Sequence, residues 1–321
     1  MRVVSLGSGS SGNALLVQVG QTTALIDAGF PARTLVGRLR QVGVAPTAIN
    51  AIFLTHEHSD HASGAVAFAR KYGAPLAGDP RTLQAVLTQS ERRAQPADEA
   101  GAATKSVERL ELAVGRSLTL GSLDVRSFPI SHDAVAPCGY VIGAAAWRVC
   151  IVTDTGEISE PILEALRSAH VLVIEANHDH DRLLHGPYPV ALKRRILSPT
   201  GHLSNEQTSQ ALARVLDDTP RWVWLAHLSR TNNTPDLARA HVREHLRQFG
   251  LGNVAPQTAP PGIGPSWDSA SLWGQAALAT GPDATSGIPA ADVEAPAAAS
   301  VTAQRVAVPI ADARLADARQ A

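Results

Sequence analysis

Short apolar runs of β-strand length recur along the first 250 residues of this chain. They include RVVSL, NALLVQV, TTALI and AIFLT, followed further along by SLTLGSLDVRSFPI, GYVIGAAAWRVCIVT, HVLVIEA and RWVWLA. Helical segments separate several of them, and two have clear start signals: a capping box at Ser204 and Gln207, and Thr234 followed by Pro235. Strands in both halves, each followed by helices, predict an α/β protein in which two sheets pack face to face with helices outside.

The composition changes at Gly250. Residues 251–321 consist largely of Ala, Pro, Thr, Ser and Asp, and such a segment buries too little apolar surface to offset the entropy lost on ordering. We therefore predict a folded domain over residues 1–250 and an Ala/Pro-rich, mostly disordered tail over residues 251–321. Trp267 and Trp273 are exceptions within the tail: either they form a short motif that docks a partner protein, or they are incidental.

The formal charges nearly cancel, with a net charge of -1 and a pI of about 6.9. No global positive field draws this chain to nucleic acid or anionic membranes, which argues against a DNA-coating protein without excluding a nuclease. The two cysteines, Cys138 and Cys150, lack metal-ligand spacing and indicate no disulfide framework. The N-terminal segment turns glycine-rich before a signal core could form, and no apolar run reaches membrane-spanning length. We predict a cytoplasmic protein with no membrane partner; the oligomeric state stays open.

Two short motifs match known signatures in the wrong context. Gly7, Gly9 and Gly12 match the G-x-G-x-x-G dinucleotide fingerprint, but the strand-like NALLVQV follows them instead of the helix that the fingerprint requires. We predict a turn between two strands, whose backbone could line the edge of a site. The segment HVREH (241–245) matches H-x-x-E-H, but no later helix offers an acidic third ligand, so a solvated helix face is favoured.

The segment THEHSDH, residues 55–61, places three histidines and two carboxylates where an apolar strand ends and a helix begins. His56 and His58, two positions apart on an extended segment, can point the same way and share one metal ion. Asp60 and His61, at the start of the helix, then face a second ion. Imidazole and carboxylate ligands suit zinc first, and manganese or iron second. The alternative is a polar loop that happens to be rich in histidine.

Three later residues could supply the ligands that a two-ion site still lacks. Each lies at the end of an apolar strand or in the loop after it: His132 follows SFPI, Asp154 follows RVCIV, and His227 follows RWVWLA. One such histidine is usually a hydrogen-bonded loop residue, but three candidates at equivalent positions favour a shared site. An aspartate can bridge two cations roughly 3.5–4 Å apart, the spacing of two-metal hydrolytic sites.

This order of motifs resembles the metallo-β-lactamase superfamily, and the resemblance spans nearly all of residues 1–250. Within the superfamily, GSGSSGNA, THEHSDH, SHDA, TDTG, EANHD, GHLSN and HLSRTNN resemble the YycJ/VicX (WalJ-type) group. The likeness implies a four-layer αββα sandwich of two mixed sheets flanked by helices, and two divalent metal ions. The implied ligands are His56, His58 and His132 on one ion, Asp60, His61 and His227 on the other, and Asp154 bridging. The likeness also implies that Asp27, in LIDAG, orients a ligand and does not itself bind metal.

Position 58 bears on the class of reaction. Diiron oxygen-reducing members of the superfamily carry a glutamate there, and His58 therefore favours hydrolysis. Two cations lower the pKa of a shared water to give a hydroxide nucleophile and stabilise charge in an in-line displacement, which suits phosphodiesters. Glu175 and His202 resemble the pair that supplies a proton to the departing oxygen in the phosphodiesterase branch. With Asp60 they form the expected catalytic group, and His202 is also the rival of His227 as the last ligand.

The family likeness implies a nuclease, with a DNA exonuclease acting on nucleic acid as the preferred activity. A phosphodiesterase acting on RNA or small nucleotides is the nearest alternative, and a thioester or lactam hydrolase with the same metals is a third class. Substrate phosphates need hydrogen-bond donors. We predict a substrate-binding rim, although such a basic run is usually a solvated helix face; its members are Lys193, Arg194, Arg195, Arg230, Asn232 and Asn233. Aromatic residues make up only 4% of the chain, so recognition by base stacking is not indicated.

Overall fold

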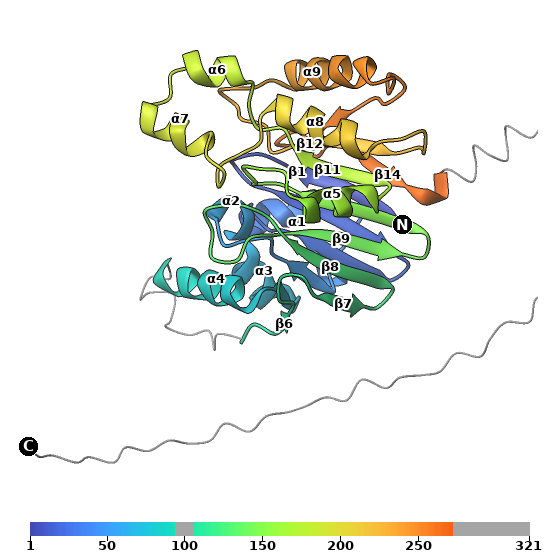
Figure 1. The fold of residues 1–321 in the computed structure, drawn as a ribbon. Coiled ribbons are helices and arrows are strands. Elements are labelled where there is room, and N and C mark those ends of the chain that lie inside the picture. Colours follow the sequence, from blue (N-terminus) through green and yellow to red (C-terminus); the bar gives the residue numbers. More distant parts are fainter. Residues whose placement is uncertain (94–105, 272–321) are drawn as a thin grey trace, which may run out of the picture. The chain divides into compact units, whose positions relative to one another are not determined.

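The computed structural model describes residues 1–93 and 106–271, and these contain two β-sheets (Figure 1). Seven strands of the described chain form the first sheet, in the order β14-β1-β2-β3-β4-β5-β6. They are β1 (Arg2–Gly7), β2 (Ala14–Val19), β3 (Thr22–Ile26), β4 (Ala51–Phe53), β5 (Leu76–Gly78), β6 (Arg109–Glu111) and β14 (Ser266–Asp268). Strands β3 to β6 run parallel to one another, whereas the pairs β14–β1, β1–β2 and β2–β3 are antiparallel, so the sheet is mixed.

Seven further strands form the second sheet, in the order β13-β12-β11-β10-β9-β8-β7. They are β7 (Ser117–Leu120), β8 (Leu123–Pro129), β9 (Cys138–Ala144), β10 (Trp147–Val152), β11 (Val171–Glu175), β12 (Trp222–Ala226) and β13 (Gln257–Thr258). Strands β10 to β13 run parallel. All five residues of β11 are buried, because layers cover both faces of the sheet; this explains its continuous apolar sequence VLVIE.

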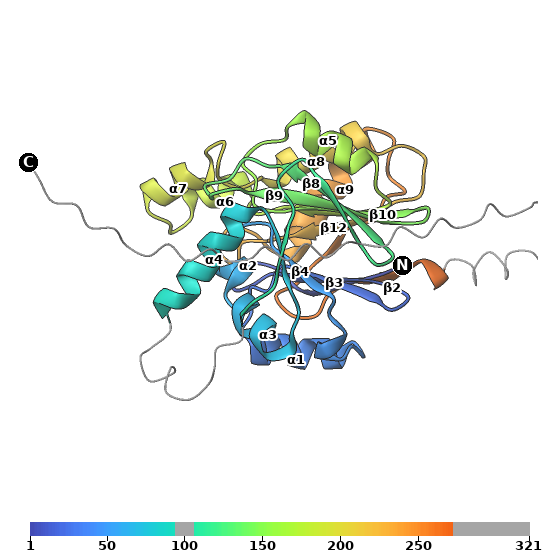
Figure 2. The same ribbon diagram turned by 90° about the horizontal axis from the view of Figure 1, so that it is seen from below.

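Helices cover the outer face of each sheet (Figure 2). Those in the first half are α1 (Ala32–Gln41), the 3₁₀ turn η1 (Pro46–Ala48), α2 (Ser59–Ala62), α3 (Ala65–Tyr72) and α4 (Pro80–Arg93). Those in the second half are α5 (Glu160–Arg167), α6 (His180–His185), α7 (Val190–Ile196), α8 (Asn205–Val215) and α9 (Pro235–Gln248). The predicted capping box at Ser204 and Gln207 starts α8, and Thr234 caps α9.

Three apolar cores separate these layers. One contains Leu35 and Phe68 and lies between the first sheet and α1, α3 and α4. A second lies between the two sheets and contains Tyr140 and Trp224. The third, which includes Leu212, lies between the second sheet and helices α5, α8 and α9. Three cores require four layers, so the predicted αββα sandwich of two mixed sheets is confirmed.

The two short motifs lie where their sequence context predicted. The GSGSSG segment connects the antiparallel strands β1 and β2, so it is a turn between strands. The HVREH segment lies in α9, where His241 pairs with the exposed Glu206 on α8 at 3.1 Å.

Both cysteines are buried free thiols. Within the described ranges, no helix combines the length and apolar character that a bilayer crossing requires.

Residues 257–258 and 266–268 form strands of the two sheets, so the predicted domain boundary at Gly250 is wrong for this stretch. Strand β13 adds to the second sheet beside β12, and β14 adds to the first sheet beside β1. A short edge strand needs only an open sheet edge and a few pairing residues, which the average composition of a segment does not reveal. Residues 272–321, where the predicted tail continues, lie outside the described part of the chain.

Trp267 on β14 is a core residue. Only 5% of its surface is exposed, and its ring centroid lies 5.1 Å from that of Trp147 and 5.3 Å from that of Trp222. The prediction that Trp267 is a docking or an incidental tail residue is therefore wrong, because its ring packs against Trp147 and Trp222 in the core between the two sheets. Trp273 lies outside the described residues, and docking through the rest of the tail stays a prediction.

Candidate metal centre

Residues predicted to bind metal or to orient its ligands lie where strands of the two sheets end. Asp27 follows β3, Asp154 lies two residues after β10, and His227 follows β12. Because neighbouring parallel strands end at the same sheet edge, the segments after them converge, as is usual for ligand sites in α/β sheets. Helix α2, which carries Asp60 and His61, begins shortly after β4 at this edge (Figure 1).

Left-handed backbone conformation is concentrated at this edge. Asp27, Asp154 and His227 have φ angles of 60°, 57° and 53°, and the only other non-glycine residue with positive φ in the described ranges is Ala145. Such conformations cost about 1–3 kcal/mol each and persist only where surrounding contacts hold them. The chain accepts this strain at three residues that all turn their side chains into one site.

His56, His58 and His132 form the first cluster, with ring nitrogens within 4.8 Å of one another. His132 Nε2 lies 3.3 Å from His58 Nδ1. Burial lowers the pKa of His56 well below its usual value, and the neighbouring His61 lowers it further. Burial also lowers the pKa of His132. Lowered pKa values favour neutral rings at His56 and His132, and the neutral ring is the protonation state that binds metal.

Hydrogen bonds behind the rings assign their tautomers. The Thr55 hydroxyl donates to the Asp27 carboxylate at 2.9 Å, so it accepts from His56 Nδ1 at 3.0 Å. His132 Nδ1 donates to the carbonyl oxygen of Thr200 at 3.1 Å, since a carbonyl can only accept. Each Nε2 therefore keeps its lone pair, as a ligand requires. His56 Nε2 is buried and has no hydrogen-bond partner among the described residues.

Asp60, His61, Asp154 and His227 form the second cluster. Asp154 Oδ2 lies 3.0 Å from His61 Nε2, and Asp60 Oδ2 lies 3.3 Å from His227 Nε2. Burial raises the pKa of Asp154, but the His227 and His61 rings outweigh it and hold that pKa well below its usual value. Asp154 Oδ1 also lies 3.9 Å from His132 Nε2, which puts this one carboxylate between the two clusters.

Two buried carboxylates sit behind the second cluster. Asp27 accepts a hydrogen bond from His61 Nδ1 at 2.7 Å. Glu175, at the end of β11, accepts from Nδ1 of both His227 and His202, at 2.9 and 2.8 Å. These bonds leave Nε2 of His61 and of His227 facing the cluster. Asp27 itself belongs to neither cluster.

The pKa values of the Glu175–His202 pair move apart. Burial raises the pKa of Glu175, but its contacts with His202 and His227 reverse this and bring it to about 2. Burial lowers the pKa of His202, but the Glu175 carboxylate outweighs it, so this pKa lies above its usual value. The His202 side chain is 21% exposed, compared with 3% for His227. His227 thus belongs to the second cluster, and the more exposed His202 forms a further group with Asp154, Glu175 and His227.

Both clusters fit a divalent metal ion. Ring nitrogens converge within each cluster, and the carboxylates of Asp60 and Asp154 supply negative charge in the second. His56 Nε2 and Asp154 Oδ2 are buried and lack a hydrogen-bond partner in the described ranges. Buried polar atoms without partners are costly, so their convergence indicates that a cation satisfies them.

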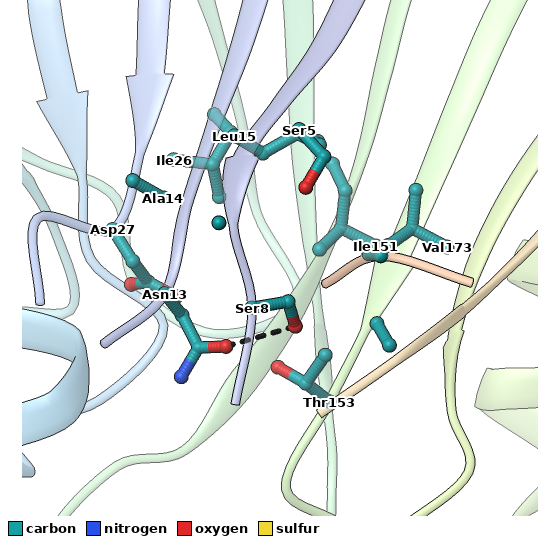
Figure 3. A pocket seen from close by; sticks show the side chains of 13 residues that line it. Ser5, Ser8, Asn13, Ala14, Leu15, Ile26, Asp27, Ile151, Thr153 and Val173 are labelled. Atoms are coloured by element: carbon teal, nitrogen blue, oxygen red, sulfur yellow. Dashed lines mark hydrogen bonds between the residues drawn. The ribbon is translucent and has the colours of Figure 1, made fainter. Parts of the chain in front are cut away.

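Side chains from the glycine-rich turn also reach the second cluster. The Ser8 hydroxyl accepts from the backbone N–H of His227 at 2.8 Å and donates to Asn13 Oδ1 at 3.0 Å, the bond drawn in Figure 3. Asn13 Nδ2 lies 2.9 Å from His61 Nε2. The Ser8–Asn13 pair lies beside a small cavity of about 30 Å³ between the two sheets. The sequence motif predicted only that the turn's backbone could line the site.

Ser8→Ala should weaken metal binding at the second cluster about 10- to 100-fold, the usual effect of removing a group that orients a ligand. The lost hydroxyl frees both the strained backbone of His227 and the amide of Asn13. Calorimetric metal titration of the apo protein measures this effect, with Ser8→Thr expected to restore affinity and the exposed Ser10→Ala as the matched control. Equal weakening at both clusters, or none, would contradict this role.

Two further residues of the centre were not assigned from sequence. Thr55 links Asp27 to His56, as described above. Glu57, inside THEHSDH, points away from the metal clusters: its carboxylate accepts from the backbone N–H of Val135 at 3.0 Å and so holds the loop that carries His132. A threonine or glutamate within a histidine-rich segment carries no local signal for such a role, because the partner lies far away in the chain.

The predicted basic rim is partly present. Arg195 and Arg230 are exposed, and Arg195 pairs with Asp133 at 2.6 Å. Lys193 Nζ donates to the carbonyl oxygen of Leu184 at 2.7 Å, and Arg194 is exposed on α7. The last turn of α7 therefore carries positive charge close to the loop of His132.

The two asparagines do not belong to this rim. Asn232 is 1% exposed and Asn233 is 2% exposed. Asn233 donates to the carbonyl oxygen of Ala176 at 2.9 Å and pairs with Asn205. Its amide therefore links its own loop to the end of β11 and to the start of α8. The prediction that both bind substrate at an exposed rim is wrong. A side-chain amide in a loop can form hydrogen bonds with buried backbone groups as readily as with solvent.

The same architecture occurs in known proteins. Residues 22–228 match the family described as Beta-lactamase superfamily domain. Similar folds include zinc-bound PqqB from Methylobacterium extorquens, with a TM-score of 0.61 and 16% identity over 84% of this chain and 100% of that one. Another is the metallo-β-lactamase fold protein YhfI from Bacillus subtilis, with a TM-score of 0.60 and 17% identity over 83% of this chain and 98% of that one. Fold and site together define a protein of the metallo-β-lactamase class.

Sequence relatives narrow this class. The chain is 36% identical to the exodeoxyribonuclease WalJ of Streptococcus pneumoniae over 264 residues, which cover 80% of this chain and 95% of that protein. It is 34% identical to the exodeoxyribonuclease YycJ of Bacillus anthracis over 247 residues, or 77% and 89% of the two chains. The chain therefore belongs to the β-lactamase superfamily and, within it, to the family of WalJ and YycJ. The resemblance predicted from the motifs is confirmed.

Proposed function

We propose that this metal-dependent hydrolase is a DNA exonuclease that works with two divalent metal ions. The observation that carries the proposal is the position of Asp154 between a cluster of three imidazoles and a cluster of mixed ligands, with the Glu175–His202 pair beside them. The names of the two relatives, both exodeoxyribonucleases, support DNA as the substrate. Zinc is the first choice of metal for imidazole-rich ligands, with manganese or iron as alternatives.

We assign His56, His58 and His132 to one ion, Asp60, His61 and His227 to the other, and Asp154 to both. The bound ions would supply an activated water and stabilise negative charge on the phosphate oxygens. Thr55 and Asp27 keep the rings of His56 and His61 in the tautomers that bind metal. Asp60 is the most exposed carboxylate of the second cluster, with 23% of its side chain accessible, so it is placed to accept a proton from the attacking water.

His202 is the proposed proton donor to the departing oxygen. Glu175 engages its Nδ1 at 2.8 Å, which leaves Nε2 as the nitrogen that can protonate a leaving group. The buried carboxylate stabilises the cationic ring and so keeps the proton available. Among the basic residues, we retain Lys193 and Arg230 as groups that contact substrate phosphates, with Arg194 and Arg195 beside them on or near α7.

The test is an end-labelling assay. Metal-reconstituted protein receives linear single- and double-stranded DNA labelled at the 5′ or 3′ end, circular single-stranded DNA, and RNA of the same sequence. We expect stepwise shortening of linear DNA, an intact circle and little RNA cleavage. His58→Ala should be more than about 100-fold slower, because it loses a metal ligand. His241→Ala is the matched control and should retain full activity, because His241 pairs with Glu206 between α9 and α8 and belongs to neither metal cluster.

Three outcomes would overturn the proposal. They are cleavage of circular DNA as fast as linear DNA, preference for RNA, and hydrolysis of only a thioester or a β-lactam. The last outcome would leave the metal assignment intact and change the substrate class.

A further inference from the structure

A cavity of about 270 Å³ opens beside the candidate metal centre. His132 and His202 form its inner edge, and α7 with the loop before it forms the outer wall. Helix α7 lies at the same end of the sheets as α2, which carries part of the metal centre (Figures 1 and 2). A group that occupied the cavity would therefore lie directly next to the reacting phosphate.

The walls of this cavity differ in chemistry. Tyr188, Leu192 and Ile196 make one side aromatic and aliphatic. Asn177 and Ser229 make the floor polar, and they are only 5% and 7% exposed. The Asn177 amide donates to the carbonyl oxygen of His227 at 2.9 Å, so the floor is fixed to the backbone of a proposed metal ligand.

Charge lies at the mouth and not in the floor. The Arg195 guanidinium pairs with Asp133 at 2.6 Å, and both residues line the cavity. The cavity therefore offers a flat apolar face, buried hydrogen-bonding groups and a positively charged side chain side by side. A nucleoside presents the matching groups: a flat base, a sugar with polar edges, and phosphates on either side.

We propose that this cavity binds the nucleoside next to the scissile phosphate, with its base stacked on the Tyr188 ring. The inference rests on the proposed nuclease function and names the contact that holds the substrate's end. Since every base has an aromatic face, stacking on one tyrosine discriminates little among the four bases. Low aromatic content did not indicate base stacking, but a single ring beside the metal centre is enough for one nucleotide.

Three chromogenic phosphodiesters isolate the contact. Thymidine p-nitrophenyl phosphate, used as its 5′ and 3′ isomers, and methyl p-nitrophenyl phosphate share one leaving group and differ only in the nucleoside. For each variant, the ratio of kcat/KM for the nucleoside ester to that for the methyl ester reports recognition of the nucleoside, independently of fold or metal content. We expect Tyr188→Ala to lower this ratio about tenfold for one isomer, the effect typical of losing one stacked base.

The control variants separate stacking from general damage. Tyr188→Phe keeps the ring and should retain the ratio, and Tyr72→Ala, on α3 away from the cavity, should leave it unchanged. An unaltered ratio in Tyr188→Ala, or an equal fall in Tyr188→Phe, would overturn the stacking proposal. Failure of the nuclease proposal looks different: the wild-type protein would hydrolyse the methyl ester and leave linear DNA intact.

Discussion

Asp154→Asn should lose most of its metal and nearly all of its hydrolytic activity. The substitution keeps the shape of the side chain and removes the charge that lies 3.0 Å from His61 Nε2 and 3.3 Å from His227 Nδ1. Removing one partner from a buried charged set costs about 3–5 kcal/mol, or roughly 10²- to 10⁴-fold in affinity. Because Asp154 also faces His132, we expect weaker binding at both clusters.

Elemental analysis after dialysis against a defined free metal concentration, together with calorimetric titration, measures this loss. Asp79→Asn is the matched control, because Asp79 is also a buried aspartate just after a strand, at 3% exposure, and is paired with Arg81 outside either cluster. That variant should bind metal as the parent protein does. If Asp154→Asn kept two ions with parental affinity, the shared-ligand assignment would have to be abandoned.

His202→Ala should slow DNA hydrolysis about 10²- to 10⁴-fold, the range expected when a general acid is removed. The same variant should lose much less activity on a p-nitrophenyl ester, because p-nitrophenolate departs without first being protonated. The partly exposed position of His202 beside the second cluster and its bond to Glu175 are the basis for this difference.

Metal content decides between the two roles considered for His202. A proton donor can be removed with both ions still bound, so the variant should retain the parental stoichiometry. Loss of an ion, with equal losses on DNA and on the p-nitrophenyl ester, would instead make His202 a ligand and reopen the assignment of His227. Comparison with His227→Ala, which should lose metal, completes the test.

Much of the fold could be predicted from local patterns. Strand-length apolar runs such as VLVIE and helix starts such as the one at Ser204 reflect propensities and caps that act over a few residues. The histidines and aspartates that follow these strands could be recognised as candidate ligands for the same reason. Parallel strands end at a common edge, so residues after such strands meet whatever the details of packing.

Other features depend on groups that are distant in sequence, and only the tertiary structure decided them. Thr55 selects the tautomer of His56 through Asp27, and Ser8 holds the backbone of His227 more than 200 residues away. Similarly, Asn233 is buried although its neighbours in sequence indicated an exposed rim.

The sequence alone determined the αββα layers and the set of side chains that could bind metal, because periodicity and strand ends are local properties. Tertiary structure decided which ring nitrogens face the clusters, that β13 and β14 complete the two sheets, and that Tyr188 lies beside the centre. Each of these depends on which surfaces lie opposite one another after packing. A hydrogen bond or a packing contact between segments distant in the chain produces no periodic pattern in the amino-acid sequence.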